Sequence, residues 1–351
     1  MFALPRSSWA DYDARRISAG GGIWSRAEKS IPVSPQAQAV LGIASASLTP
    51  NELIGAILRA QVDLLYNGGI GTYVKSAGET HADVGDRAND AVRINGTELR
   101  CKVVCEGGNL GLTQRGRIEA AINGVRLYTD AIDNSAGVDT SDHEVNIKIL
   151  LSMPMADSRL SLQQRNELLA EMTDDVAELV LQDNYFQTQA LSVGKHTARK
   201  LLEQQQRMMR FLEKEGRLNR ALEFLPDDET IAERRAAGLA LTGPELAVLL
   251  AYAKMWLSDE LLVSSLPDDP WFATALLRYF PQRLIAQFGG DISRHPLRRE
   301  IVATVVLNEM VNRVGPSFTH QMTSSTGATP AQVVRAFMLP VPARTAFAAA
   351  M

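Results

Sequence analysis

The sequence contains only two cysteines, Cys101 and Cys105, in 351 residues. They stand four positions apart within one predicted strand, and a single strand cannot bend them into a disulfide of normal geometry. Their spacing does not fit a zinc-binding pattern either. The scarcity of cysteine therefore excludes a disulfide-stapled secreted scaffold and predicts two buried thiols in a reducing cytosol.

Long hydrophobic runs and an excess of charge of one sign are also missing. The most apolar segment, residues 239–262, is interrupted by a proline and four charged side chains, which is typical of a core helix. The N-terminus has no continuous apolar region of the kind found in signal peptides. A net charge of −4 and a pI near 5.8 give no general case for nucleic acid or anionic membrane as a partner. We therefore expect a cytoplasmic protein without either partner.

A G-x-G-x-x-G turn, which marks a complete dinucleotide-binding domain, is absent as well. Instead, three short apolar runs each end in a loop rich in glycine and amide side chains. They are residues 62–66 before 67–71, residues 101–105 before 106–109, and residues 125–129 before 133–137. Such runs are typical of buried parallel strands. Either the site is not a full Rossmann site, or its first half is missing.

The glycine loops indicate a binding site because ligands of open α/β sheets bind outside the carboxyl ends of the strands. Glycine lets the backbone approach a ligand closely, and asparagine offers both donors and acceptors. Asn67, Gly68 and Gly69 could therefore cradle a cofactor through their backbone N–H groups. A structural turn is the alternative for this loop alone. The companion loop at residues 106–109 favours one edge of a nucleotide-binding site.

The pattern along the chain changes near Leu151. Before it, a capping box at Thr49 opens a helix that runs through Arg59, and residues 112–123 predict a helix between the second and third strands. After it, the pattern is helical, and helices are predicted over residues 161–182 and 195–223. A further helix is predicted after a capping box at Thr242, and another has Pro296 in its first turn and runs to Asn312. The predicted fold is α/β, a partial Rossmann-like parallel sheet followed by a mainly α-helical region. Its expected divisions are residues 1–151, 152–338 and a disordered or truncated tail, 339–351.

Residues 133–142 are the best single candidate for an anion site. A helix is predicted to begin directly after the loop, at Val138, and a helix N-terminus offers free N–H groups and positive partial charge. Thr140 and Ser141 add hydroxyl donors that suit a carboxylate or a phosphate. Ordinary capping by Asp139 and Asp142 is the alternative interpretation.

Three other constellations are weaker. Asp139 and His143, one helical turn apart, could share a metal, but the sequence brings no third ligand within reach, so no metal site is predicted. His81, Asp83 and Asp86 are better explained as a polar loop. Residues 194–197 resemble a P-loop but lack its first glycine and the hydroxyl residue after the lysine.

Several longer motifs occur together. Residues 63–73 read DLLYNGGIGTY, 81–87 HADVGDR, 106–111 EGGNLG, 133–138 DNSAGV and 141–146 SDHEVN. In combination they closely resemble the large bacterial NAD-specific glutamate dehydrogenases. The resemblance is strong over residues 4–151 and continues more weakly to about residue 337.

The resemblance implies an oxidoreductase of amino-acid catabolism that oxidises L-glutamate to 2-oxoglutarate and ammonia, passes a hydride to NAD and forms very large homo-oligomers. In the related smaller enzymes an E-G-A-N loop lies by the cofactor, and here it reads Glu106, Gly107, Gly108 and Asn109. Their N-A-G-G-V-x-x-S segment corresponds to residues 134–141. On this match Asn109 and Asn134 contact NAD, and Ser141 holds the side-chain carboxylate of the substrate.

The match also has departures. Tyr66 stands where the family has tryptophan, and residues 340–351 differ from the family. The family's glycine-rich turn, catalytic lysine and acid–base aspartate are expected upstream of this chain, which is therefore interpreted as an inactive fragment whose exposed sheet edge invites aggregation. The alternatives are a non-catalytic nucleotide- or anion-binding module with a helical interaction region, or a dehydrogenase acting on a neighbouring amino acid.

Overall fold

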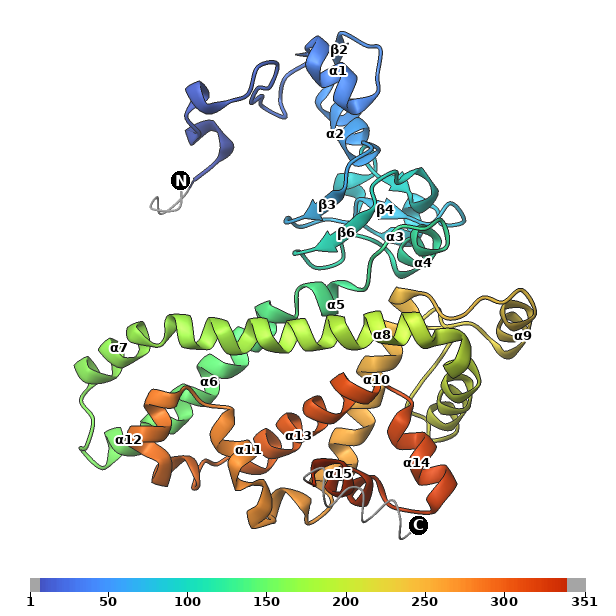
Figure 1. Cartoon of the computed structure of the whole chain (residues 1–351). Coiled ribbons are helices and arrows are strands. Elements are labelled where there is room, and N and C mark those ends of the chain that lie inside the picture. The colour runs from blue at the N-terminus through green and yellow to red at the C-terminus, as the bar shows by residue number, and fades with distance from the viewer. Residues whose placement is uncertain (1–6, 340–351) are drawn as a thin grey trace. The chain divides into compact units, whose positions relative to one another are not determined.

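The computed structural model describes residues 7–339 (Figure 1). The chain divides into two compact units, Met1–Asp130 and Ala131–Met351. The division predicted near Leu151 falls inside a helix, and the assignment of domains on either side of it stays a prediction. The predicted tail, apart from Leu339, lies outside the described residues.

The first unit is built from short elements. Its strands are β1 (Ile31–Pro32), β2 (Ser47–Leu48), β3 (Leu64–Asn67), β4 (Val74–Lys75), β5 (Ile94–Asn95) and β6 (Val103–Glu106). Its helices are α1 (Pro35–Leu41), α2 (Pro50–Leu58), α3 (His81–Val84) and α4 (Gln114–Ile122), with 3₁₀ turns η1 (Trp9–Asp11), η2 (Ala14–Arg16), η3 (Arg87–Asn89) and η4 (Gly96–Glu98). The predicted capping box is confirmed, because Thr49 and Glu52 each accept the other's backbone N–H at the start of α2.

The first two predicted strands pair in parallel as β3 and β6, with Asn67 opposite Glu106. The third predicted strand, residues 125–129, is reduced to one parallel bridge between Arg126 and Val103. Strands β4 and β5 form a second parallel pair, and β1 and β2 an antiparallel one. Helix α4 connects β6 to the bridge, as predicted. The core beneath these elements consists of Val74, Ile94, Leu99, Cys101, Val104, Leu112, Ala120, Val125 and Leu127.

Both cysteines lie in this part of the chain and neither forms a disulfide. Cys101 is buried in the core, and burial raises the pKa of its thiol. Cys105 is half-buried on β6. The expectation that the two thiols do not bridge is confirmed, whereas the expected burial is confirmed for Cys101 and wrong for Cys105.

The described part of the second unit is helical. Its helices, after α5 (Asp130–Asp133) at the boundary, are α6 (Ser135–Ala156), α7 (Leu162–Glu171), α8 (Thr173–Lys214), α9 (Asp228–Ala236), α10 (Gly243–Leu262), α11 (Ala273–Arg278), α12 (Gln282–Ile292), α13 (Arg298–Val314), α14 (Phe318–Thr326) and α15 (Pro330–Met338), with 3₁₀ turns η5 (Leu266–Asp268) and η6 (Pro270–Phe272). The chain as a whole is thus mixed α/β and mainly helical. Within residues 7–339, none of the helices has the length and apolar character needed to cross a bilayer.

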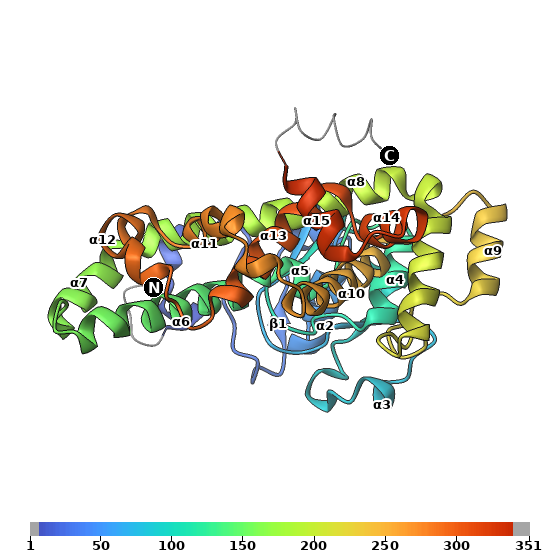
Figure 2. The same cartoon turned by 90° about the horizontal axis from the view of Figure 1, so that it is seen from below.

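Helices α8, α10 and α13 pack against one another, and α6 packs against α8 (Figures 1 and 2). Leu250 and Leu257 of α10 and Val306 and Met310 of α13 are among the buried side chains of this core. The apolar faces predicted from the sequence meet here, and the burial of these faces stabilises the helices.

Several helix boundaries differ from the sequence-based expectation. The helix predicted over 161–182 is divided at Met172 between α7 and α8, and the helix predicted to reach residue 223 ends at Lys214. Helix α8 runs for 42 residues, so the break expected between residues 182 and 195 is wrong. Helix α6 begins at Ser135 and not at Val138. The segment predicted as the third loop is therefore α5, Asn134 and the first turn of α6. Ser141 lies in the second turn, whereas the unpaired N–H groups belong to the first four residues.

Candidate functional site

The loops that follow β3 and β6 leave the parallel pair at the same end. The N–H of Gly108 donates a hydrogen bond of 3.0 Å to the carbonyl oxygen of Asn67. A Cβ atom on Gly108 would lie 2.3 Å from the carbonyl oxygen of Gly69, so glycine is needed for the two loops to touch. The two glycine loops therefore contact each other at one end of the β3–β6 pair.

Two other glycines make room for side chains of β3. A Cβ atom on Gly107 would lie 2.2 Å from the hydroxyl of Tyr66, and one on Gly111 would lie 1.8 Å from Nδ2 of Asn67. Gly69 differs, because a Cβ atom there would meet no other atom within 4 Å. Its exposed backbone is a position that a ligand can approach without displacing protein atoms.

Glu106 forms a buried ion pair that supports the second loop. The residue is 0% exposed, and its carboxylate accepts hydrogen bonds of 2.7 and 2.9 Å from the guanidinium of Arg117 and one of 3.0 Å from the N–H of Leu112. Arg117 also pairs with Asp130 at 3.0 Å, and Asp130 accepts the N–H of Leu110. The loop is thus held at both ends. Neither Arg117 nor Asp130 is predicted from the sequence, since a single Arg on a helix and an Asp after a strand carry no signal of pairing.

Asn67 leaves a donor at the end of β3 without a partner. Its Oδ1 accepts the N–H of Gly69 at 3.3 Å, whereas its Nδ2 is shielded from solvent and has no hydrogen-bond partner within residues 7–339. Buried side-chain donors are nearly always bonded. Asn109 of the companion loop is exposed.

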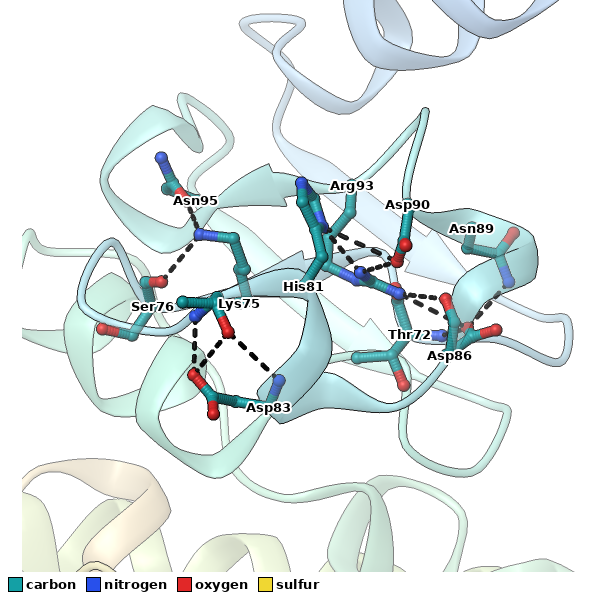
Figure 3. Close-up of polar contacts among 11 residues, drawn as sticks. Thr72, Lys75, Ser76, His81, Asp83, Asp86, Asn89, Asp90, Arg93 and Asn95 are labelled. Carbon is teal, nitrogen blue, oxygen red and sulfur yellow. Dashed lines mark hydrogen bonds and ion pairs between the residues drawn. The ribbon is translucent and has the colours of Figure 1, made fainter.

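A buried arginine organises the polar segment beyond β4 (Figure 3). The side chain of Arg93 is 0% exposed. It donates to Asp90 at 2.6 Å, to Nδ1 of His81 at 2.8 Å, and to the carbonyl oxygens of Thr72 and Asp86. The arginine therefore ties this loop to the residue that follows the first glycine loop.

The carboxylates of the same segment are engaged in local structure. Asp83 accepts the N–H of Thr80 at 2.8 Å in a capping box on α3. Asp86 accepts the N–H of Thr72 at 2.8 Å and the amide of Asn89, and these bonds hold its pKa below the usual range. The polar-loop interpretation is wrong for His81 and Asp83, which lie in the short helix α3, whereas Asp86 lies in the loop between α3 and η3.

Asn134 and Ser141 belong to the second unit, whereas the other candidate residues belong to the first. Asn134 precedes the first turn of α6, and Ser141 is exposed. Asn184 of α8 donates to the carbonyl oxygen of Ile132 and to the hydroxyl of Ser135, both at 2.9 Å. The start of α6 is thus fixed by α8, a contact that the sequence did not predict.

Comparison with known proteins identifies the class of protein to which a chain with these glycine loops and this helical region belongs. Residues 1–194 match the model for the catalytic domain of bacterial NAD-glutamate dehydrogenase, and residues 238–350 match that for the C-terminal region of glutamate dehydrogenase. The chain belongs to the bacterial NAD-glutamate dehydrogenase family.

Individual relatives agree with this assignment. The chain is 52% identical over 339 residues to the NAD-specific glutamate dehydrogenases of Pseudomonas aeruginosa and Halomonas elongata, and 49% identical over 344 residues to that of Mycobacterium tuberculosis. The alignments cover 96–97% of this chain but only 21% of the length of each relative.

Proposed function

We propose that this chain is part of an NAD-dependent glutamate dehydrogenase, which oxidises L-glutamate to 2-oxoglutarate and ammonia. The observation that carries the proposal is the 52% identity to NAD-specific glutamate dehydrogenases over 97% of the chain. Residues 1–194, which match the model of the catalytic domain, include the glycine loops after β3 and β6. The proposed protein is cytoplasmic, as its few unpaired cysteines favour, and homo-oligomeric, as the resemblance implies.

The residues at the ends of β3 and β6 fit NAD. The cofactor, when bound, accepts the hydride from the substrate. Three features support the fit: the unpartnered Nδ2 of Asn67, the open backbone at Gly69, and the close packing of Gly107 and Gly108 that brings the two loops together. Backbone N–H groups and amide donors of this kind suit phosphate and carboxamide oxygens.

The roles proposed for the remaining residues are based on their burial and on their contacts. Glu106 acts as a positioning residue, since its buried carboxylate is occupied by Arg117. Asn109 and Asn134 contact NAD through their amides, and Gly68 contributes its backbone. Ser141 donates a hydrogen bond to the side-chain carboxylate of glutamate; its exposure on α6 is consistent with that role.

We further propose that β3, β6 and the bridge at Arg126 are part of a Rossmann-like sheet. In this proposal residues 1–151 contribute to the dinucleotide-binding and catalytic region, and residues 152–338 form the helical region. No residue of this chain takes the role of the family's catalytic lysine or acid–base aspartate, and other parts of the enzyme supply them. Without such groups to polarise the substrate carbonyl and move protons, the chain alone has no turnover.

The first experiment measures NAD reduction with L-glutamate. The chain is assayed alone and after the upstream coding region has been restored in one polypeptide. We expect activity in the restored protein only. Activity of the chain alone would contradict the proposal that the acid–base residues lie elsewhere. A folded, restored protein that binds NAD without turnover would favour the non-catalytic nucleotide-binding module.

A pair of glycine substitutions tests the cofactor loop. Gly69→Ala adds a methyl group where no protein atom lies within 4 Å, so stability should not change. If the backbone approaches NAD at this point, calorimetric titration of the restored enzyme with NAD should show weaker binding. Gly289→Ala on α12, which also meets no atom within 4 Å, is the matched control. Equal NAD affinity in both variants would remove Gly69 from the site.

A further inference from the structure

A histidine and two aspartates meet inside the helical unit. Asp139 and His143 lie one turn apart on α6, and Asp183 comes from α8, which packs against α6 (Figure 1). Each side chain offers one ligand atom, and the three atoms lie within 4.8 Å of one another. Nε2 of His143 is 3.8 Å from Oδ1 of Asp139. The sequence offered only the pair on α6; the packing of α8 supplies the third group.

Several buried polar atoms around this cluster have no hydrogen-bond partner among the described residues. They are Oδ2 of Asp139, Nδ1 of His143, Oδ1 of Asn146 and Oδ1 of Asn312. His143 is only 2% exposed. Buried polar groups are usually bonded to protein, ordered water or an ion. Three of these atoms belong to residues that line one cavity, Asp139, His143 and Asn312, and a bound group in that cavity would complete their coordination.

The same cluster lines a cavity of about 300 Å³. Asp139, His143 and Asp183 contribute to its wall together with Tyr279 and Asn312. The ring of Tyr279 stacks on the imidazole of His143, with ring centroids 4.3 Å apart, and its hydroxyl accepts the amide N–H of Asn146 at 2.9 Å. The imidazole is thus held in one orientation, and the cavity has room for an ion with its water ligands.

The charged neighbours of the cavity include Arg278 and Arg313, and both arginines pair with Glu309. The two aspartates of the cluster are paired differently. Two carboxylates face each other without a hydrogen bond or ion pair of 4.0 Å or less to a cation among the described residues, apart from the contact of Asp139 with His143. Lys254 of α10 is near enough to attract both carboxylates electrostatically. A cation in the cavity that binds both carboxylates directly would neutralise their charge more effectively than Lys254 does from a distance.

We propose that Asp139, His143 and Asp183 form a binding site for a divalent transition-metal ion. One imidazole nitrogen and two carboxylate oxygens suit Zn²⁺ or Mn²⁺, whereas Mg²⁺ prefers an all-oxygen octahedral shell. Water fills the remaining positions, and Oδ1 of Asn312 can accept a hydrogen bond from it. The ion would tie α6, which carries Ser141, to the long helix α8.

The test is direct titration of the chelator-treated chain with ZnCl₂, MnCl₂ and MgCl₂ by calorimetry, with circular dichroism as a check of folding. We expect one Zn²⁺ or Mn²⁺ per chain and weaker binding of Mg²⁺. Asp183→Asn and His143→Gln should each weaken binding by about tenfold or more. Lys254→Met, which removes a competing positive charge, should strengthen it.

The controls are residues of the same helices that point elsewhere. Glu144→Gln removes an exposed carboxylate beside His143 that pairs with Lys148, and His196→Gln removes an exposed histidine of α8. Both should bind metal as the unmodified chain does. The proposal is overturned if the chain binds none of these ions saturably, or if Asp183→Asn binds them unchanged. Asp183→Asn still tests the proposal if His143→Gln fails to fold, because Asn has nearly the same shape as Asp and should leave the fold intact. The readout does not depend on glutamate oxidation.

Discussion

Glu106 shows how the surroundings of one side chain decide its role. Its position in an E-G-G-N loop marks it as part of a cofactor site, yet both of its oxygens are occupied by Arg117 and a backbone N–H. The ion pair is buried, with side-chain exposures of 5% and 1%. A buried pair that loses one partner leaves an uncompensated charge, which is costly.

We predict that Arg117→Met lowers the free energy of unfolding by about 3–5 kcal/mol. The measurement is denaturant unfolding, with hydrogen exchange of the β3 and β6 amides to locate the effect in the first unit. Lys102→Met is the control, because its pair with Asp63 is exposed and should contribute nothing measurable. Equal losses in the two variants would show that burial of the pair does not matter.

Asp228 gives a prediction for the dependence of stability on pH. It accepts hydrogen bonds from Gln206, Arg220 and Arg210, and these lower its pKa to about 2. Because the pKa is lower in the folded state, the stabilisation is present above about pH 4 and disappears as the pH falls through 2. The side chain is 42% exposed, so solvent screening reduces the contribution to about 1 kcal/mol.

The corresponding measurement is urea unfolding of Asp228→Asn and the unmodified chain between pH 7 and pH 2. The difference should be largest near neutral pH and should vanish near pH 2. Glu229→Gln, an exposed neighbour in the same helical turn, should leave the pH profile unchanged. A difference for Asp228→Asn that does not vary with pH would contradict this assignment.

At the scale of elements, α8 remains one continuous helix where the sequence predicts a break. The sequence pattern predicts a new helix from residue 195, but α8 continues through Gly194 because its apolar face packs against α6, α10 and α13. A Cβ atom on Gly194 would lie 4.0 Å from Cδ1 of Leu246, which is ordinary contact. The glycine therefore costs helix stability without being required for the packing.

Gly194→Ala should therefore stabilise the chain by about 0.5–1 kcal/mol, measured as a higher midpoint of thermal or urea unfolding. Gly216 lies just beyond the end of the same helix with a φ of +68°, so Gly216→Ala should destabilise it. A loss of stability in Gly194→Ala would show that the contact between α8 and α10 is tighter than the backbone geometry indicates.

At the scale of the whole molecule, the first unit leaves apolar side chains of its parallel pair in solvent. Leu64 and Tyr66 on one face of β3 are 54% and 62% exposed, and the loop residue Ile70 is 94% exposed. Parallel sheets normally have both faces covered. Uncovered apolar surface and an open strand edge favour self-association.

We expect the chain alone to self-associate with increasing concentration in light-scattering measurements, and the double variant Leu64→Thr, Tyr66→Thr to do so less. Threonine keeps the strand propensity while removing apolar area. Leu222→Thr with Val263→Thr, at side chains of the helical unit that are 70% and 86% exposed, should not change the scattering. If the control pair has the same effect, general surface hydrophobicity and not the sheet is responsible.

Local sequence signals predicted much of this fold. The capping boxes at Thr49 and Thr242, the helix between the second and third runs, and the parallel pairing of the first two runs are all present. Each depends on neighbours in the chain or on a strong apolar run. The strand predicted over residues 125–129 is reduced to one parallel bridge between Arg126 and Val103, because strand pairing depends on a distant partner and not on the apolar run alone.

The sequence by itself determined the family, the glycine loops and the order of the elements, because motifs, caps and apolar periodicity are local properties. Only the tertiary structure decided that Glu106 binds Arg117, that Gly107 and Gly108 serve close packing, and that Asp183 joins Asp139 and His143. Such contacts join residues far apart in the chain. Their existence depends on how helices and strands pack, and no spacing within a single segment encodes it.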